Sequence, residues 1–138
     1  IYASLRYWRQ NASAHEADHY SVAYYLLDTR QGGCGCTVYL LASFGEYDLT
    51  EDGYELGAAG SCNAMALSFS HVNGLYQLTE VWRPLDGGLY EPEVRACFPE
   101  AAANVVFSPH GSPQYEAIRE ALDSYLAMDV KAWYESLA

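Results

Sequence analysis

Two alternating segments joined by Asn73-Gly74 constrain this chain more than any other feature of its sequence. In residues 63–70, large apolar side chains alternate with Ala and Ser, which is the period-2 pattern of a strand with one buried face. Asn-Gly tolerates the positive φ values of a two-residue hairpin turn. Residues 75–83 supply a returning strand, which Pro84 ends. The sequence therefore predicts an antiparallel hairpin.

A two-residue turn predicts which residues of this hairpin face one another. The expected pairs on the apolar face are Phe69 with Leu78, Leu67 with Glu80, and Met65 with Trp82. Glu80 is then the single acid in an apolar row, and a buried carboxylate needs a partner or must be neutralised. We expect a buried Glu80 that is held by Arg6, Arg95 or a tyrosine hydroxyl. The alternative is that Glu80 lies at the sheet margin and reaches water.

The residues before the hairpin predict one helix and two further strands. Apolar residues recur at three-residue spacing in residues 1–10, which favours a short amphipathic helix. Residues 21–29 and 37–47 are rich in β-branched and aromatic side chains and predict strands. The glycines and acids of residues 48–60 predict a solvated loop.

The residues after the hairpin predict two helices. A short helix is expected at residues 92–98, and a long one with an apolar stripe follows Ser112 as N-cap and Pro113 as first helical residue. The expected fold is a single α+β domain over residues 1–138. In it, an N-terminal helix and a long C-terminal helix pack on a four-stranded antiparallel meander, in a cystatin-like or similar arrangement.

Length and charge narrow the class of protein. A chain of 138 residues suits one domain. Seven Lys and Arg against 18 Asp and Glu give a formal charge of −11, which disfavours nucleic acid and anionic lipid as partners. No apolar run approaches the ~20 residues that span a bilayer, so we expect no membrane insertion by this segment. The chain begins at Ile1 without a signal pattern, and we expect it to be a segment of a longer protein.

One segment matches a zinc-hydrolase pattern, because residues 15–19 read His-Glu-Ala-Asp-His. On a helix, His15 and His19 would share one face as zinc ligands, and Glu16 would polarise the metal-bound water. However, the residues that follow are strand-like, and on a strand the two histidines lie ~13 Å apart. No convincing third ligand follows either. The preferred interpretation is a polar lead-in to the first strand, and the zinc site is the alternative.

The cysteines form an even set, which permits two disulfides in three pairings: Cys34, Cys36, Cys62 and Cys97. Their spacing lacks a C-x-x-C pair and does not favour zinc. We interpret them as structural cysteines, some of them bonded, and leave the pairing open. The acids of residues 46–55 lack the alternating spacing of a calcium loop and predict a solvated face, so no cofactor is expected.

Thirteen tyrosines are many for this length, and they leave two interpretations open. Tyrosine provides contact area and a hydroxyl at low entropy cost, so an acidic, Tyr-rich surface suits peptide or sugar binding. The other interpretation is that the tyrosines fill the sheet. The chain has no G-x-S-x-G pattern and no Gly-rich phosphate loop, so no catalytic residues are assigned.

A block in the second half of the chain has a wider resemblance. It reads LTEVW at residues 78–82, DGGLY at 86–90 and VRACFP at 94–99. In this order it resembles a segment of extracytoplasmic domains of Firmicutes. Those domains occur at the C-terminus of BlaR/MecR-type membrane metallopeptidases, or as separate secreted or lipid-anchored proteins. The resemblance implies a non-catalytic sensor-side or accessory domain outside the cell, and it supplies no site residues.

We therefore expect a non-catalytic extracytoplasmic module that binds a protein or a small ligand in a membrane-linked system. A zinc-dependent hydrolase and a purely structural domain are the alternatives. The identity of the ligand or partner and the oligomeric state are left open.

Overall fold

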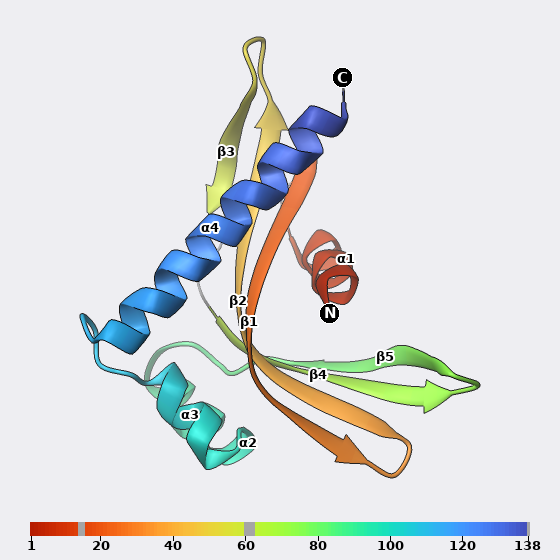
Figure 1. Ribbon diagram of the computed structural model, residues 1–138, viewed down its shortest axis with the longest axis vertical. Coiled ribbons are helices and arrows are strands. Elements are labelled where there is room, and N and C mark those ends of the chain that lie inside the picture. The colour runs from red at the N-terminus through yellow and green to blue at the C-terminus, as the bar shows by residue number, and fades with distance from the viewer. Residues whose placement is uncertain (14–15, 60–62, 138) are drawn as a thin grey trace. The chain divides into compact units, whose positions relative to one another are not determined.

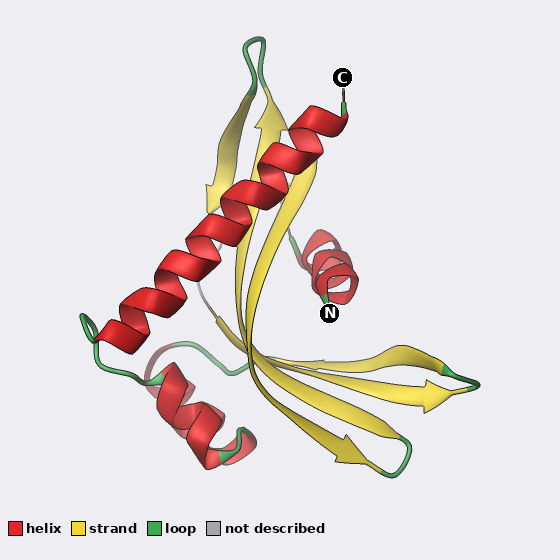
Figure 2. Cartoon of the chain, in the orientation of Figure 1, coloured by secondary structure: helices red, strands yellow, loops and turns green. Residues whose placement is uncertain are grey.

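The structure, a computed structural model, describes residues 1–13, 16–59 and 63–137. It confirms an α+β fold with a mostly antiparallel sheet, an N-terminal helix and a long C-terminal helix (Figure 2). The elements, labelled in Figure 1, are α1 (Tyr2–Ala12), β1 (His19–Gly32), β2 (Gly35–Leu49), β3 (Tyr54–Ala59), β4 (Asn63–Val72), β5 (Leu75–Trp82), the 3₁₀ helix η1 (Gly87–Leu89), α2 (Tyr90–Cys97), α3 (Glu100–Val106) and α4 (Pro113–Ser136).

The sheet has five strands in the part of the chain that the structure describes, so the predicted number of four is wrong. The strand order is β1-β2-β4-β5, and β3 also pairs with β2. The additional strand β3 lies where we expected a solvated loop. A tight turn, in which the Thr50 N–H donates to the Gly53 carbonyl at 2.9 Å, brings Tyr54 opposite Leu49. From there β3 pairs with the end of β2. The loop is therefore confined to a few residues.

The predicted hairpin is confirmed as β4 and β5. Asn73 (φ 54°) and Gly74 (φ 78°) occupy its turn with the positive φ values that an Asn-Gly pair tolerates. Phe69 pairs with Leu78 as predicted. Met65 and Leu67 are both 0% exposed, so the predicted apolar face is buried there. Ala64 and Ala66 are also buried, at 0% and 4% exposed, so the prediction that only one face of this strand is buried is wrong.

The prediction that Glu80 is a buried acid is wrong. A β-bulge on β5 shifts the register beyond Phe69, so that Glu80 lies opposite Ser68 instead of Leu67. Thr79 is the extra residue of this bulge. Successive side chains of a strand point to opposite faces, so one extra residue moves Glu80 off the apolar row. Its side chain is exposed.

The chain divides into two compact units, which we describe separately. The first unit comprises Ile1–Tyr24, Ala42–Cys62 and Arg119–Ala138, and the second comprises Tyr25–Leu41 and Asn63–Ile118. Strands β1 and β2 and helix α4 contribute residues to both units. The single domain that we expect from the length stays a prediction.

In the first unit, aromatic side chains join both helices to the strands. Trp8 of α1 packs on Phe44 of β2 with ring centroids 5.6 Å apart. Trp133 and Tyr134 of α4 contact Tyr54 of β3, with centroid distances of 6.5 and 5.1 Å. Figure 1 shows the C-terminal part of α4 lying across these strands. In this unit, α1 therefore packs on β2 and α4 packs on β3.

In the second unit, Phe98 packs on Tyr39 of β2 and on Trp82 of β5, with ring centroids 5.1 and 5.9 Å away. The segment after α2 therefore covers one face of the sheet. Strands β2 and β4 approach closely at Gly35, where an added Cβ would lie 1.8 Å from the carbonyl oxygen of Phe69. A glycine is required at this position.

The helices of the second half follow the predicted signals in part. The Ser112 hydroxyl accepts the Tyr115 N–H at 3.2 Å, and α4 begins at Pro113, as predicted. The expected short helix is α2, while α3 was not predicted. Among the helices that the structure describes, none combines the length and the apolarity needed to span a membrane.

Candidate functional site

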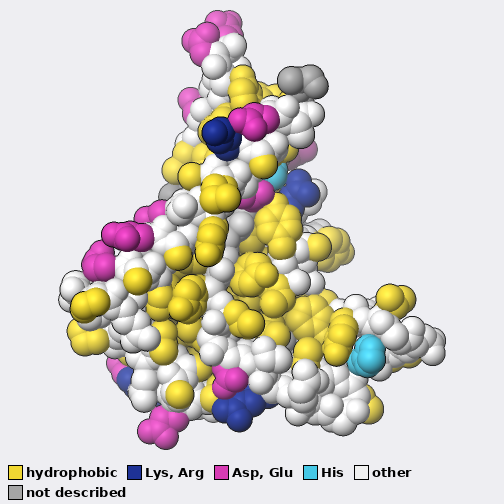
Figure 3. All heavy atoms as spheres, in the orientation of Figure 1, with side chains coloured by type: hydrophobic (Ala, Val, Ile, Leu, Met, Phe, Trp, Pro, Cys, Tyr) yellow, Lys and Arg dark blue, Asp and Glu magenta, His cyan; other side chains and the backbone are white. Residues whose placement is uncertain are grey.

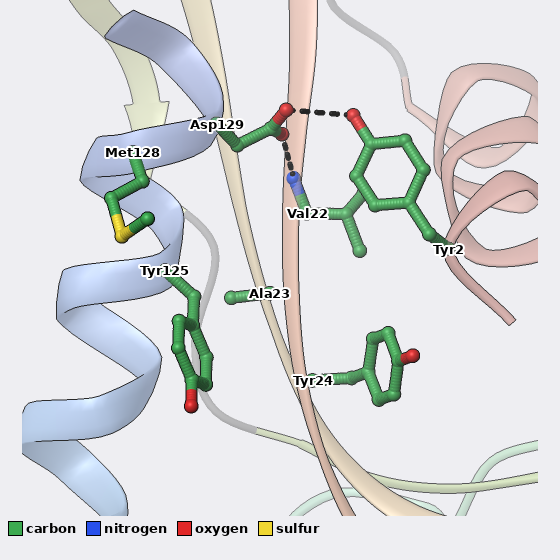
Figure 4. A pocket seen from close by; sticks show the side chains of 7 residues that line it. All are labelled: Tyr2, Val22, Ala23, Tyr24, Tyr125, Met128 and Asp129. Carbon is green, nitrogen blue, oxygen red and sulfur yellow. Dashed lines mark hydrogen bonds between the residues drawn. The ribbon is translucent and has the colours of Figure 1, made fainter. Parts of the chain in front are cut away.

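Asp129 of α4 joins three elements of the first unit through hydrogen bonds (Figure 4). The Tyr2 hydroxyl of α1 donates to Oδ1 at 2.7 Å. On β1, the Ser21 hydroxyl and the Val22 N–H each donate to Oδ2 at 2.8 Å. Bonds to an ionised acceptor are about twice as strong as those between neutral groups. The carboxylate therefore ties α1 and α4 to β1.

His19 lies against the same carboxylate without forming a close hydrogen bond. Its Nε2 is 3.5 Å from Oδ2 of Asp129. The imidazole is 3% exposed and stacks on Trp133, with ring centroids 4.7 Å apart and an interplanar angle of 11°. Among the residues that the structure describes, neither ring nitrogen has a hydrogen-bond partner. The ring therefore packs between β1 and α4 beside the Asp129 carboxylate.

The hydrogen bonds and the neighbouring His19 ring set the protonation of this network. Burial by itself raises the pKa of Asp129, but the His19 ring, the Val22 N–H and the two hydroxyls outweigh it and lower that pKa to about 2. Burial, and next the bond to Asp129, raise the pKa of Tyr2 to about 12. At neutral pH the carboxylate is therefore ionised and the Tyr2 hydroxyl keeps its proton.

An open groove of about 540 Å³ lies beside this network, within the first unit. Tyr125 and Met128 of α4, which are 51% and 63% exposed, form one of its walls. Figure 3 shows hydrophobic side chains gathered beside α4. The residues that line the groove, shown in Figure 4, are Tyr2, Val22, Ala23, Tyr24, Tyr125, Met128 and Asp129. The groove thus presents aromatic and thioether surface to solvent.

The polar groups beside the groove are engaged with one another. The Ser21 hydroxyl is on a residue that is 0% exposed and already donates to Asp129, so it is not an accessible nucleophile. Asp129 accepts three hydrogen bonds and has a lowered pKa, which makes it a weak proton acceptor. Both groups are therefore occupied within the network.

Similarity to known proteins does not identify the groove. No family model, no curated protein and no solved structure matches the chain. The resemblance of the block at residues 78–99 to BlaR/MecR-type accessory domains therefore stays a prediction.

The zinc-hydrolase segment is described only in part, because His15 lies outside the described residues. Glu16 is exposed in a stretch without regular structure, and β1 begins at His19, so the expected lead-in to the first strand is confirmed for residues 16–18, whereas His19 belongs to the strand. Asp18 in this stretch accepts the Leu49 N–H at 2.8 Å. Within the described ranges, no three or more His, Cys, Asp or Glu side chains gather where they could hold a metal ion.

Three of the four cysteines lie in the described ranges, and each is a free thiol: Cys34, Cys36 and Cys97. Cys62 lies outside those ranges. Cys34 is exposed, whereas Cys97 is partly buried. Burial, followed by the nearby Glu80 carboxylate, raises the pKa of the Cys97 thiol. The disulfide pairing stays a prediction.

A buried acid that the sequence reasoning missed is Glu46 of β2. It is 1% exposed, although we expected it on a solvated acidic face. Its Oε1 lies 3.6 Å from Nε of Arg9, whose guanidinium lies 5.4 Å from the centroid of the Phe44 ring. The signal was present in the alternation, because the even-numbered positions of residues 38–44 form one apolar face and Glu46 is the next position on that face.

The sequence reasoning also missed Asp129. The signal was its position, three residues after Leu126 and four before Trp133, which places the acid within the apolar stripe of α4. An acid in such a stripe needs hydrogen-bond donors, and Tyr2, Ser21 and Val22 provide them.

Proposed function

We propose that the chain is a non-catalytic binding module that holds a small ligand or a segment of a partner protein in the groove of its first unit. The observation that carries this proposal is the groove, where large apolar side chains stand exposed around about 540 Å³ of open space. Exposed apolar surface with a few polar groups is typical of interaction sites. Tyrosine rings add contact area with few torsions to immobilise.

The resemblance of residues 78–99 to BlaR/MecR-type accessory domains supports a location for this module. In this proposal, the chain works outside the cytoplasm, secreted or membrane-anchored, as an accessory module of a membrane-linked system of the BlaR/MecR type in Firmicutes. The long helix on an antiparallel sheet supports a cystatin-like architecture, which is part of the same proposal.

The neutral dye N-phenyl-1-naphthylamine tests the groove, because it fluoresces in apolar sites and is not repelled by an acidic protein. We expect a saturable rise in fluorescence with the native protein. Tyr125→Ala and Met128→Ala should each weaken dye binding by about fivefold or more, since each removes roughly 1 kcal/mol or more of apolar contact.

Tyr7→Ala is the matched control, because Tyr7 is 68% exposed on α1 and does not line the groove. It should leave dye binding unchanged. A fluorescence rise that does not saturate, or an equal loss in the control variant, would contradict the proposal.

A further inference from the structure

The floor of the groove is the outer edge of β1. In the part of the chain that the structure describes, the only strand that pairs with β1 is β2, so the other edge of β1 has no strand beside it. The Val22 N–H points toward that free edge, because it donates to Asp129 of α4. Backbone groups two residues apart on a strand point to the same side. The N–H and C=O of Tyr24 therefore also point away from β2.

The walls of the groove follow this edge. Figure 4 shows the bond between Tyr2 and Asp129 beside Val22, with Tyr24 further along β1 and Tyr125 on α4 across from it. The groove thus has a polar end at Val22 and extends along β1 to Tyr24. An unpaired strand edge next to side-chain pockets is the geometry by which proteins bind an extended peptide as an additional strand.

We propose that the groove binds an extended segment of a partner protein, which pairs with β1 at Tyr24 and alternates apolar with basic side chains. This inference rests on the proposed function and deepens it. The apolar residues of the segment would contact Tyr125 and Met128, which are exposed in the free chain. Hydrogen bonds to the backbone edge would provide the register.

The charge of the first unit indicates why the segment is basic. The unit contains four Lys and Arg side chains against eleven Asp and Glu side chains. Arg9 lies against the buried Glu46, and Lys131 lies 3.9 Å from Glu135, so acids remain in excess. A basic segment is attracted by this field.

The same charge disfavours a second copy of the chain as the occupant. Pairing of two β1 edges would bring together two chains that each carry a formal charge of −11. Like charges on neighbouring strands destabilise their pairing. We therefore commit to a basic partner, and self-pairing becomes an outcome of the test.

The probe is a fluorescent heptapeptide in which Lys and Val alternate, with two N-methylated versions as matched controls. One version carries methyl groups on the backbone nitrogens of its Val residues, and the other carries them on the backbone nitrogens of its Lys residues. Each version therefore loses the N–H donors along one edge of the peptide strand, while the charge of the peptide is unchanged. We expect the unmodified peptide to bind. One methylation pattern should weaken binding at least about tenfold, because it removes two or more hydrogen bonds, and the other should have a smaller effect.

The matching changes in the protein are Tyr24→Val and Tyr24→Pro. The first removes the ring and keeps the N–H, whereas the second also removes the N–H that points away from β2, a change that edge strands tolerate. Tyr24→Pro should weaken peptide binding about fivefold more than Tyr24→Val. In the native chain, the peptide should also slow hydrogen exchange of the Tyr24 amide, a readout that does not depend on how the variants fold.

The outcomes separate this inference from the proposed function. Equal binding of all three peptides would mean attraction by charge alone and would overturn strand addition. If no peptide binds while the dye does, strand addition is overturned and the proposed function stands; if neither binds, both are overturned. Dimerisation that protects the Tyr24 amide without peptide would identify a second copy as the occupant and would also overturn the inference.

Discussion

Replacement of Asp129 by Ala should lower the free energy of unfolding by about 2–4 kcal/mol. It removes the acceptor of Ser21 and Val22, which are 0% and 3% exposed, and an unsatisfied buried donor costs about 1–3 kcal/mol. The Ser21 hydroxyl can turn to the Leu126 carbonyl 3.2 Å away, and the Tyr2 hydroxyl can bond to water. The Val22 N–H has no such substitute, so most of the effect should come from it and from the lost charge-assisted bonds.

The part of this stabilisation that depends on the charge should disappear in acid. The pKa of Asp129 is lowered from 3.8 to about 2 in the folded chain, so the ionised form stabilises the fold above about pH 4. That contribution is lost as the pH falls through about 2. At about 1.4 kcal/mol per pKa unit this shift corresponds to roughly 2 kcal/mol, and because the side chain is 17% exposed, solvent screening reduces it to about 1–2 kcal/mol.

Urea unfolding followed by tryptophan fluorescence checks both statements. Asp129→Asn removes the charge and keeps one oxygen acceptor, so its difference from the native chain should shrink between about pH 5 and about pH 3. Asp123→Ala, an exposed acid on the same helix, is the control and should change stability by less than about 0.5 kcal/mol. The account would be refuted if the native chain and Asp129→Asn lost stability in parallel as the pH falls. It would also be refuted if Asp129→Ala and Asp123→Ala lowered the free energy of unfolding equally.

Three further outcomes test the fold and the thiols. Leu67→Ala should cost about 2–5 kcal/mol in urea unfolding because Leu67 is 0% exposed, whereas Glu80→Gln should change stability by less than about 0.5 kcal/mol because Glu80 is exposed. Gly74→Ala should cost about 1 kcal/mol in the same measurement, because φ is 78° there. With a thiol reagent at neutral pH, Cys34 should react faster than Cys97, because Cys34 is exposed and burial raises the pKa of Cys97; equal rates, measured by mass spectrometry of the labelled sites, would contradict this.

The hairpin could be predicted because its signals are local. Asn73 and Gly74 encode the turn, and the alternation beside them encodes the strand β4. The bulge at Thr79 has no such signal, since an extra residue in one strand depends on how both strands pack on the rest of the sheet. The predicted register was therefore correct next to the turn, at Phe69, and wrong beyond it.

Composition was a poor guide to β3. Glycines and acids predicted a solvated loop, yet Tyr54 pairs with Leu49 and packs on Trp133 and Tyr134 of α4. Strand propensity depends on such contacts more than on the residues themselves. The aromatic partners come from the far end of the chain, so the local pattern could not reveal them.

The acids Asp129 and Glu46 explain why the candidate site itself could not be read from local patterns. Alternation and helical spacing indicate which face an acid occupies, and both of these acids lie on apolar faces. Whether a carboxylate is stable there depends on its donors and counter-charges. For Asp129, the Tyr2 hydroxyl and the Val22 N–H come from 127 and 107 residues away. The groove is assembled over the same separations, so a tertiary structure is needed before its residues can be recognised as one surface.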